Sequence, residues 1–253
     1  GPDCPLLAAP EELAELAGLM EAPMRLEDQD GDHLTLIQQE PLMAVAGIAA
    51  RKKDGETVSG DAGTYFKRGD GTLYVLLCDG MGSGPQANRE SSLALRLLEQ
   101  FLQAGVETEH ALVTLNSALA LRGEEAGGFT TVDLLQVDLF TGDGVVFKLG
   151  AAPTYVRKGG TVRRISGASL PAGLAAEERS APDRFPIHLS PGDCVLLVSD
   201  GVTGTEDDSW LRERLVKFDQ GSPKELARDL ITHSPQGATD DSTALVIRLE
   251  KRE

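Results

Sequence analysis

The sequence predicts an α+β protein, a four-layer αββα sandwich in which two mostly antiparallel β-sheets are flanked by helices. Apolar runs of strand length alternate with Gly-rich turns, so hairpins outnumber crossover connections and antiparallel pairing is favoured. Helical patterns fall into two clusters, residues 86–122 and 207–233, and each cluster lies between blocks of strands. Two stacked sheets with a helical layer on each outer face fit this order.

The first forty residues differ from the rest. Residues 10–20 place Leu13, Leu16 and Met20 on one side of a helix and acidic residues on the other. A polar stretch follows. We therefore expect residues 1–40 to be an N-terminal linker with a regulatory helix, and residues 41–253 to form the main domain.

Strands of the main domain are predicted from apolar or alternating runs bounded by turn residues. They are residues 42–53, the hairpin 64–78, 129–140, 145–150, the hairpin 153–165, 184–189, 194–199 and 242–249. The predicted helices are residues 86–103, 109–122, 207–218 and 222–233. Ser222 and Glu225 form a capping box at the start of the last helix.

Composition limits the classes of partner and compartment. The net charge of −16 disfavours nucleic acid and anionic membranes as direct partners. No run approaches 18 apolar residues, so no membrane-spanning segment is predicted. Cys78 and Cys194 lie in apolar runs, which indicates that both are core residues. The cysteines show no disulfide pattern, which indicates a reducing compartment. The four histidines lack zinc-site spacing.

Acidic residues recur at the ends of predicted strands. Asp79 follows a buried run and precedes Gly80, and Asp200 repeats this arrangement before a second glycine. Asp61 lies after Gly60, and Asp240 lies at the mouth of the last strand. Hard divalent cations prefer oxygen ligands of this kind, from carboxylates, backbone carbonyls and water. The four aspartates therefore predict a metal centre.

The expected chemistry follows from the charge of such a cluster. Four crowded carboxylates cannot all remain ionised without compensation. Two divalent cations would supply that compensation and acidify coordinated water, which suits hydrolysis at phosphorus without a protein nucleophile. The sequence also lacks the GxSxG pattern of a serine nucleophile.

The acidic motifs resemble those of a known family. Residues 60–61 (GD), 79–84 (DGMGSG), 199–201 (SDG) and 240–243 (DDST) occur in the order and spacing of the metal-dependent serine/threonine protein phosphatases, the PPM family. Ala87, Glu90 and Ser91 match the bacterial branch that includes stage II sporulation protein E. The resemblance covers about residues 42–249, so residues 41–253 are expected to be a PPM-type phosphatase domain.

The resemblance implies a role for each site residue. Asp79 would bridge two Mn²⁺ or Mg²⁺ ions, and the Gly80 carbonyl and Asp61 would serve one of them. Asp200 and Asp240 would hold the other ion. The neighbouring Asp241 would either support the ligands or lie at the surface. Arg51 is the nearest candidate for a phosphate-binding arginine, but its surrounding motif does not match, so it is not assigned.

The resemblance also implies a substrate. It would be a phosphorylated anti-sigma-factor antagonist of the STAS type, whose dephosphorylation activates a sporulation sigma factor. Two alternatives stay open: a related phosphatase of a general stress-response partner switch, and a catalytically silent docking module. The helices at residues 86–104 and 109–122 would either move about Gly82 and Gly84 to complete the metal site or form a packed outer layer. A homodimer would use the N-terminal helix and these switch helices.

The start of the chain bears on localisation. Gly1-Pro2 without an initiator Met resembles a protease-cleavage scar, and no signal peptide is apparent. We expect a cytoplasmic fragment of a longer protein that is membrane-anchored through a missing N-terminal region. The fragment itself is expected to make no direct membrane contact.

Overall fold

The computed structural model describes residues 10–20, 23–30, 33–122, 128–174, 181–204, 207–218 and 221–252. The chain divides into two compact units, residues 1–41 with 252–253, and residues 42–251. None of the helices in these described ranges combines the length and apolar character needed to cross a lipid bilayer.

The smaller unit contains the predicted N-terminal helix, α1 (Pro10–Leu19), and a hairpin of β1 (Met24–Asp30) and β2 (His33–Gln38). The strands pair antiparallel from Met24 opposite Gln38 to Asp30 opposite His33. Residues 24–38 are predicted from the sequence to be part of a linker, but β1 and β2 form a hairpin there. The missed signal is an Asp-Gly pair at residues 30–31 between two runs with alternating apolar residues.

The larger unit is built on two five-stranded antiparallel sheets. The first sheet has the order β10 (Asp183–His188), β7 (Asp143–Leu149), β6 (Thr130–Asp138), β5 (Thr72–Gly80) and β4 (Asp61–Lys67). The second has the order β3 (Leu42–Arg51), β12 (Ser242–Lys251), β11 (Cys194–Val198), β8 (Thr154–Lys158) and β9 (Thr161–Ile165).

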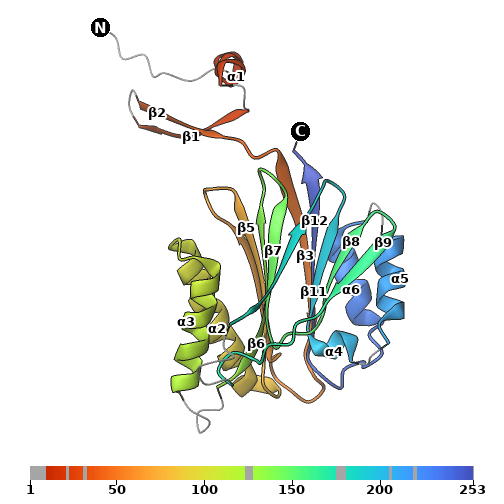
Figure 1. Cartoon of the computed structure of the whole chain (residues 1–253). Coiled ribbons are helices and arrows are strands. Elements are labelled where there is room, and N and C mark those ends of the chain that lie inside the picture. The colour runs from red at the N-terminus through yellow and green to blue at the C-terminus, as the bar shows by residue number, and fades with distance from the viewer. Residues whose placement is uncertain are drawn as a thin grey trace. The chain divides into compact units, whose positions relative to one another are not determined.

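Helices cover the outer faces of this pair of sheets (Figure 1). The first sheet is covered by α2 (Gly84–Gln103) and α3 (Thr108–Leu121), and the second by α5 (Ser209–Lys217) and α6 (Pro223–Thr232). A single turn, α4 (Asp200–Thr203), follows β11. The predicted capping box at Ser222 and Glu225 is present at the start of α6. The predicted four-layer αββα sandwich is confirmed.

The burial of the interior strand β5 on both faces explains why its sequence is apolar without alternation. Leu73, Val75 and Leu77 pack in the core between the sheets. Residues of the opposite parity, including Leu76 and Cys78, pack beneath α2 and α3. A strand buried on both faces needs apolar residues at every position. Its polar residue Asp79 comes where the strand leaves this core.

Candidate metal centre

Two of the predicted ligands come from neighbouring strands of the first sheet. Asp61 begins β4 and lies directly opposite Asp79 near the end of β5. On its other side, Asp79 lies opposite Thr131 of β6, and the Thr130 hydroxyl donates to the Asp79 backbone carbonyl at 2.7 Å. The antiparallel ladder therefore fixes both carboxylates in one row at the end of the sheet.

The other two predicted ligands come from the second sheet. Asp200 follows β11 and is the first residue of α4, and Asp240 lies just before β12. Because β11 and β12 pair antiparallel, with Val198 opposite Ala244, the end of one strand lies beside the start of the other. Gly201 makes a close approach here, since a Cβ at this position would lie 2.0 Å from the Asp241 carbonyl oxygen.

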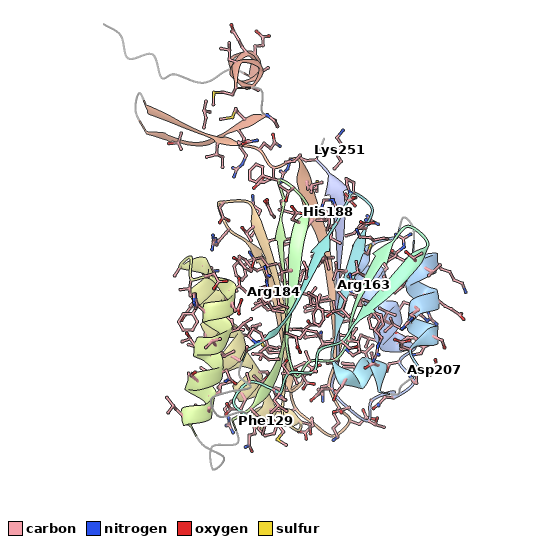
Figure 2. The ribbon with its side chains drawn as sticks, in the orientation of Figure 1. Phe129, Arg163, Arg184, His188, Asp207 and Lys251 are labelled. Carbon is pink, nitrogen blue, oxygen red and sulfur yellow. The ribbon has the colours of Figure 1, made fainter. Side chains whose placement is uncertain are left out.

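The two sheets bring these four aspartates together at one pocket. Its volume is about 290 Å³, and three of the aspartates line it. The lining residues are Lys53, Asp79, Gly80, Met81, Gly82, Phe129, Thr130, Thr131, Pro171, Asp200 and Asp240. Figure 2 labels Phe129 at the lower end of the sheets in that view. Asp61 is only 8% exposed and does not line the pocket, but it interacts with Asp79.

The electrostatics of the cluster raise the pKa of three of its carboxyl groups in the absence of cations. Burial, followed by the negative charges of Asp61 and Asp200, raises the pKa of Asp79 to about 9. Burial is also the main cause that raises the pKa of Asp61 to about 6. The pKa of Asp200 is raised by burial and then by the charge of Asp240. Burial and the neighbouring carboxylates thus make the ionised forms of these groups unfavourable.

The hydrogen bonding of Asp61 tests whether a cation fits. Both of its carboxylate oxygens are buried without a well-formed hydrogen bond, although Ser199 and Thr243 lie near enough to lower its pKa. Buried carboxylate oxygens are normally satisfied. Among the described residues, no three Asp, Glu, His or Cys side chains are placed to hold one ion by themselves. The two buried Asp61 oxygens fit a hard cation that also takes backbone carbonyl and water oxygens.

Gly80 connects this pocket to α2. A Cβ on Gly80 would lie 2.2 Å from the backbone oxygen of Ala87, so only glycine allows the helix to pack this closely against the strand end. Further along α2, the buried Glu90 carboxylate pairs with Arg122, which caps α3, at 2.7 Å. The first half of α2 therefore contacts both the strand end that lines the pocket and the end of α3.

Asp241 is buried, so the alternative prediction that it lies at the surface is wrong. Its two carboxylate oxygens accept hydrogen bonds from the backbone amides of Lys53 and Gly60, each at 2.8 Å. Asp241 thereby holds the segment before Asp61 against the start of β12.

Lys53 is a cationic pocket-lining residue that was not predicted from the sequence. Arg51, the candidate considered there, instead donates a hydrogen bond to the Gly237 carbonyl. The Arg51-Lys52-Lys53 run was visible as three cations, but β3 ends at Arg51, so strand alternation does not extend to Lys53.

The fold and these residues agree with comparisons to known proteins. The family model "Stage II sporulation protein E (SpoIIE)" matches residues 69–250. The chain is 30% identical over 213 residues to stage II sporulation protein E of Priestia megaterium, which covers 81% of this chain and 36% of that protein. It is 29% identical over 214 residues to the Bacillus subtilis (strain 168) protein, covering 81% of this chain and 25% of that protein. The chain thus spans about a third or less of these relatives.

A solved structure extends the match to nearly the whole chain. The PP2C phosphatase domain of SpoIIE from Bacillus subtilis, solved with a fragment of its regulatory domain, is 25% identical. It superposes with a TM-score of 0.79 and covers 97% of this chain and 76% of that chain. The family model matches well over half of the present sequence. The protein therefore belongs to the stage II sporulation protein E family and has the PP2C-type fold of the PPM serine/threonine phosphatases.

Proposed function

We propose that this domain is a metal-dependent phosphoserine protein phosphatase. The observation that carries the proposal is the proximity of four aspartates from two sheets. Asp79, Asp200 and Asp240 line one pocket, and Asp61 lies directly opposite Asp79. The raised pKa values and the unsatisfied oxygens of Asp61 support it, because bound cations would favour the ionised carboxylates.

The proposed ligand set follows the resemblance. Asp79 would bridge two Mn²⁺ or Mg²⁺ ions, with Asp61 and the Gly80 carbonyl on one ion and Asp200 and Asp240 on the other. When bound, the two ions would polarise the phosphate and acidify the attacking water.

The chain's own residues would orient the substrate. Lys53 lines the same pocket and carries a positive charge that can pair with a phosphate oxygen. The side chains of Phe129 and Pro171 form part of the wall, and Thr131 adds a hydroxyl beside Asp79. A phosphoserine side chain in this pocket would thus contact the Lys53 ammonium group, the Thr131 hydroxyl and the apolar surface of Phe129 and Pro171.

We propose a phosphorylated anti-sigma-factor antagonist of the STAS type as the substrate, which would connect the domain to activation of a sporulation sigma factor. Membership of the SpoIIE family supports this proposal. A partner-switch phosphatase of the general stress response is the competing assignment. Release of phosphate from serine-phosphorylated STAS proteins of both pathways, compared at equal concentration, distinguishes them by kcat/KM.

Regulation through α2 and α3 is part of the same proposal. The contact between Gly80 and Ala87 and the pair between Glu90 and Arg122 support it, because movement of either helix would alter the pocket edge. The unit that contains α1 is proposed to relay a signal. Alternatively, α1, α2 and α3 would form the interface of a homodimer.

Membrane anchoring of a longer protein is likewise proposed, and fractionation of cells with an antibody to this domain tests it.

The test of the function uses the whole chain with Mn²⁺ and a serine-phosphorylated STAS protein. Asp200→Asn should reduce phosphate release by on the order of a thousandfold or more, since bound metal ions contribute several kcal/mol. Asp143→Asn, at a side chain that is 73% exposed, is the matched control and should retain activity. Binding of the phosphoprotein by the wild-type chain without any phosphate release would instead identify a silent docking module.

A further inference from the structure

A second pocket lies between the free edges of the two sheets. Among the described strands, β10 of the first sheet pairs only with β7, and β9 of the second sheet pairs only with β8. The edge groove between them has a volume of about 570 Å³. Its lining residues are Val156, Lys158, Thr161, Arg163, Pro186, Ile187 and His188.

The edge groove is separate from the metal centre. None of its lining residues lines the aspartate pocket. Figure 2 places His188 toward the opposite end of the sheets from Phe129. A ligand in this groove would therefore not compete with a phosphate at the aspartates.

The edge groove is basic on a strongly acidic protein. Lys158 and Arg163 line it, and Arg184, on β10 beside Pro186, is exposed as well. The described part of the chain provides neither Arg163 nor Arg184 with a carboxylate partner. The net charge of the whole chain is −16, so this cluster of cations runs against the overall charge.

Carboxylates near the groove offset this charge only in part. Asp143 lies 2.9 Å from His188, and Asp193 lies 3.9 Å from the Lys158 ammonium group. The Asp193 carboxylate also accepts a hydrogen bond from the Ser190 backbone amide, so it is not paired with Lys158 alone. Within the described ranges, Arg163 of the groove and the neighbouring Arg184 are exposed and lack a carboxylate partner.

The floor of the groove is apolar. Val156 is 3% exposed and belongs to the core between the sheets, and Ile187 is partly buried against the same core. Pro186 adds a further apolar surface. A ligand that matches this lining has an apolar group flanked by negative charges.

Strand geometry favours an extended peptide. An edge strand exposes unpaired backbone amides and carbonyls that can bind another strand. On β10 this is limited by Pro186, which has no backbone N–H to donate. The sequence of β9, TVRRI, has no such interruption. The β9 side of the groove is thus the side available for pairing.

We propose that the edge groove binds an acidic peptide segment of a partner protein, extended along β9, with an apolar side chain on Val156 and Ile187 and carboxylates paired with Lys158 and Arg163. Charge complementarity is the argument for this occupant, because acidic residues would be attracted here and repelled by much of the remaining surface. Binding at this groove does not depend on hydrolysis at the metal centre.

The test is a binding measurement on the whole chain with a library of fluorescein-labelled seven-residue peptides that alternate Glu with Val, Ile or Leu. Wild-type protein should bind members of this library by fluorescence anisotropy. The double variant Lys158→Glu/Arg163→Glu should weaken the Kd at least about tenfold, which corresponds to about 1.4 kcal/mol. Both side chains are exposed, so the fold should be retained, and an unchanged unfolding temperature verifies this.

The controls separate this groove from general charge attraction. Lys251→Glu, at an exposed lysine outside the groove (Figure 2), should leave the Kd unchanged. Peptides with Gln in place of Glu should bind weakly. The proposal is wrong if no library member binds, if the double variant binds as well as wild type, or if a single-stranded oligonucleotide binds the groove more tightly than any acidic peptide.

Discussion

Asp61 on β4 and Asp79 on β5 are directly opposite each other in an antiparallel ladder, and both side chains are largely buried. Side chains at such positions have Cβ atoms roughly 5 Å apart, and like charges placed there are destabilising. The ladder therefore holds two mutually repelling acids together. Protonation or a bound cation relieves the repulsion, and this gives the candidate site measurable properties independent of catalysis.

Removing one charge from this pair should stabilise the metal-free protein. Asp79→Asn keeps the size of the side chain but removes its contribution to the repulsion with Asp61 and Asp200. The expected gain is about 1 kcal/mol, or roughly 2–4 °C in Tm for a protein of this size. Thermal unfolding in EDTA measures it. Asp143→Asn is the control, and a lower Tm for Asp79→Asn than for wild type would contradict the prediction.

Divalent cations should stabilise the wild-type chain, and a chelator should reverse the effect. A ligand that binds only the folded state stabilises it by about 2.7 kcal/mol at a concentration one hundred times its Kd. The increase in Tm with added Mn²⁺ should be lost in Asp79→Asn, since this residue contacts both Asp61 and Asp200 electrostatically. An equal increase in wild type and variant would place the cation elsewhere.

Stability of the metal-free protein should fall as the pH rises. The folded-state pKa is raised from 3.8 to about 6 for Asp61 and to about 9 for Asp79. The folded state therefore binds these protons more tightly than the unfolded state, and their contribution is complete below about pH 4 and lost as the pH passes each folded pKa. Chemical denaturation in EDTA between pH 5 and 9 measures the slope. Saturating Mn²⁺ should flatten it, and a slope of opposite sign in EDTA would refute the assignment.

The sequence alone located the four aspartates because each stands beside glycine or small polar residues at the end of an apolar run. Their convergence depends on which strands pair, β4 with β5 and β11 with β12, and sequence spacing does not determine that pairing. From the sequence, the convergence of the four aspartates is therefore a hypothesis. The short helix α4 was missed for a local reason, since four residues are too few for a periodic pattern.

Residues whose role depends on loop conformation could not be predicted. Lys53 follows the last residue of β3, and hydrogen bonds from the backbone amides of Lys53 and Gly60 to Asp241 fix this segment. Asp241 lies 188 residues away from Lys53 along the chain. Nothing local in the sequence indicates this contact, so the position of Lys53 at the pocket followed only from the fold.

Lys53 should contribute to recognition of the phosphoserine group. Lys53→Met removes the ammonium group and leaves the backbone amide that binds Asp241. The KM for a serine-phosphorylated protein should rise roughly tenfold, or about 1.4 kcal/mol, with a smaller change in kcat. Inhibition by inorganic phosphate should weaken in parallel.

The neighbouring Lys52 provides the matched control for this experiment. It is exposed, and its ammonium group donates to the Glu56 backbone carbonyl outside the pocket lining. Lys52→Met should leave KM unchanged. Equal effects of the two substitutions would show that general surface charge, rather than a contact in the pocket, attracts the substrate.

A buried ion pair of the first sheet is hydrogen-bonded to a threonine of the second sheet. The Lys148 ammonium group lies 2.8 Å from an Asp133 carboxylate oxygen and donates to the Thr154 hydroxyl at 2.8 Å. The Thr154 hydroxyl in turn donates to the other Asp133 oxygen at 2.5 Å. Lys148 and Asp133 are on β7 and β6 of the first sheet, and Thr154 is on β8 of the second. Asp133 is two residues after the pocket-lining Thr131.

Breaking this pair from one side should destabilise the protein strongly. Lys148 is fully buried and Asp133 is 1% exposed, so Lys148→Met leaves an uncompensated carboxylate inside the protein. The expected loss is about 3–5 kcal/mol, measured by denaturant unfolding. The double variant Lys148→Met/Asp133→Leu should recover most of it, because replacing both charges leaves neither one unpaired. If the double variant loses the sum of the two single losses, the two charges are not coupled and the prediction is wrong.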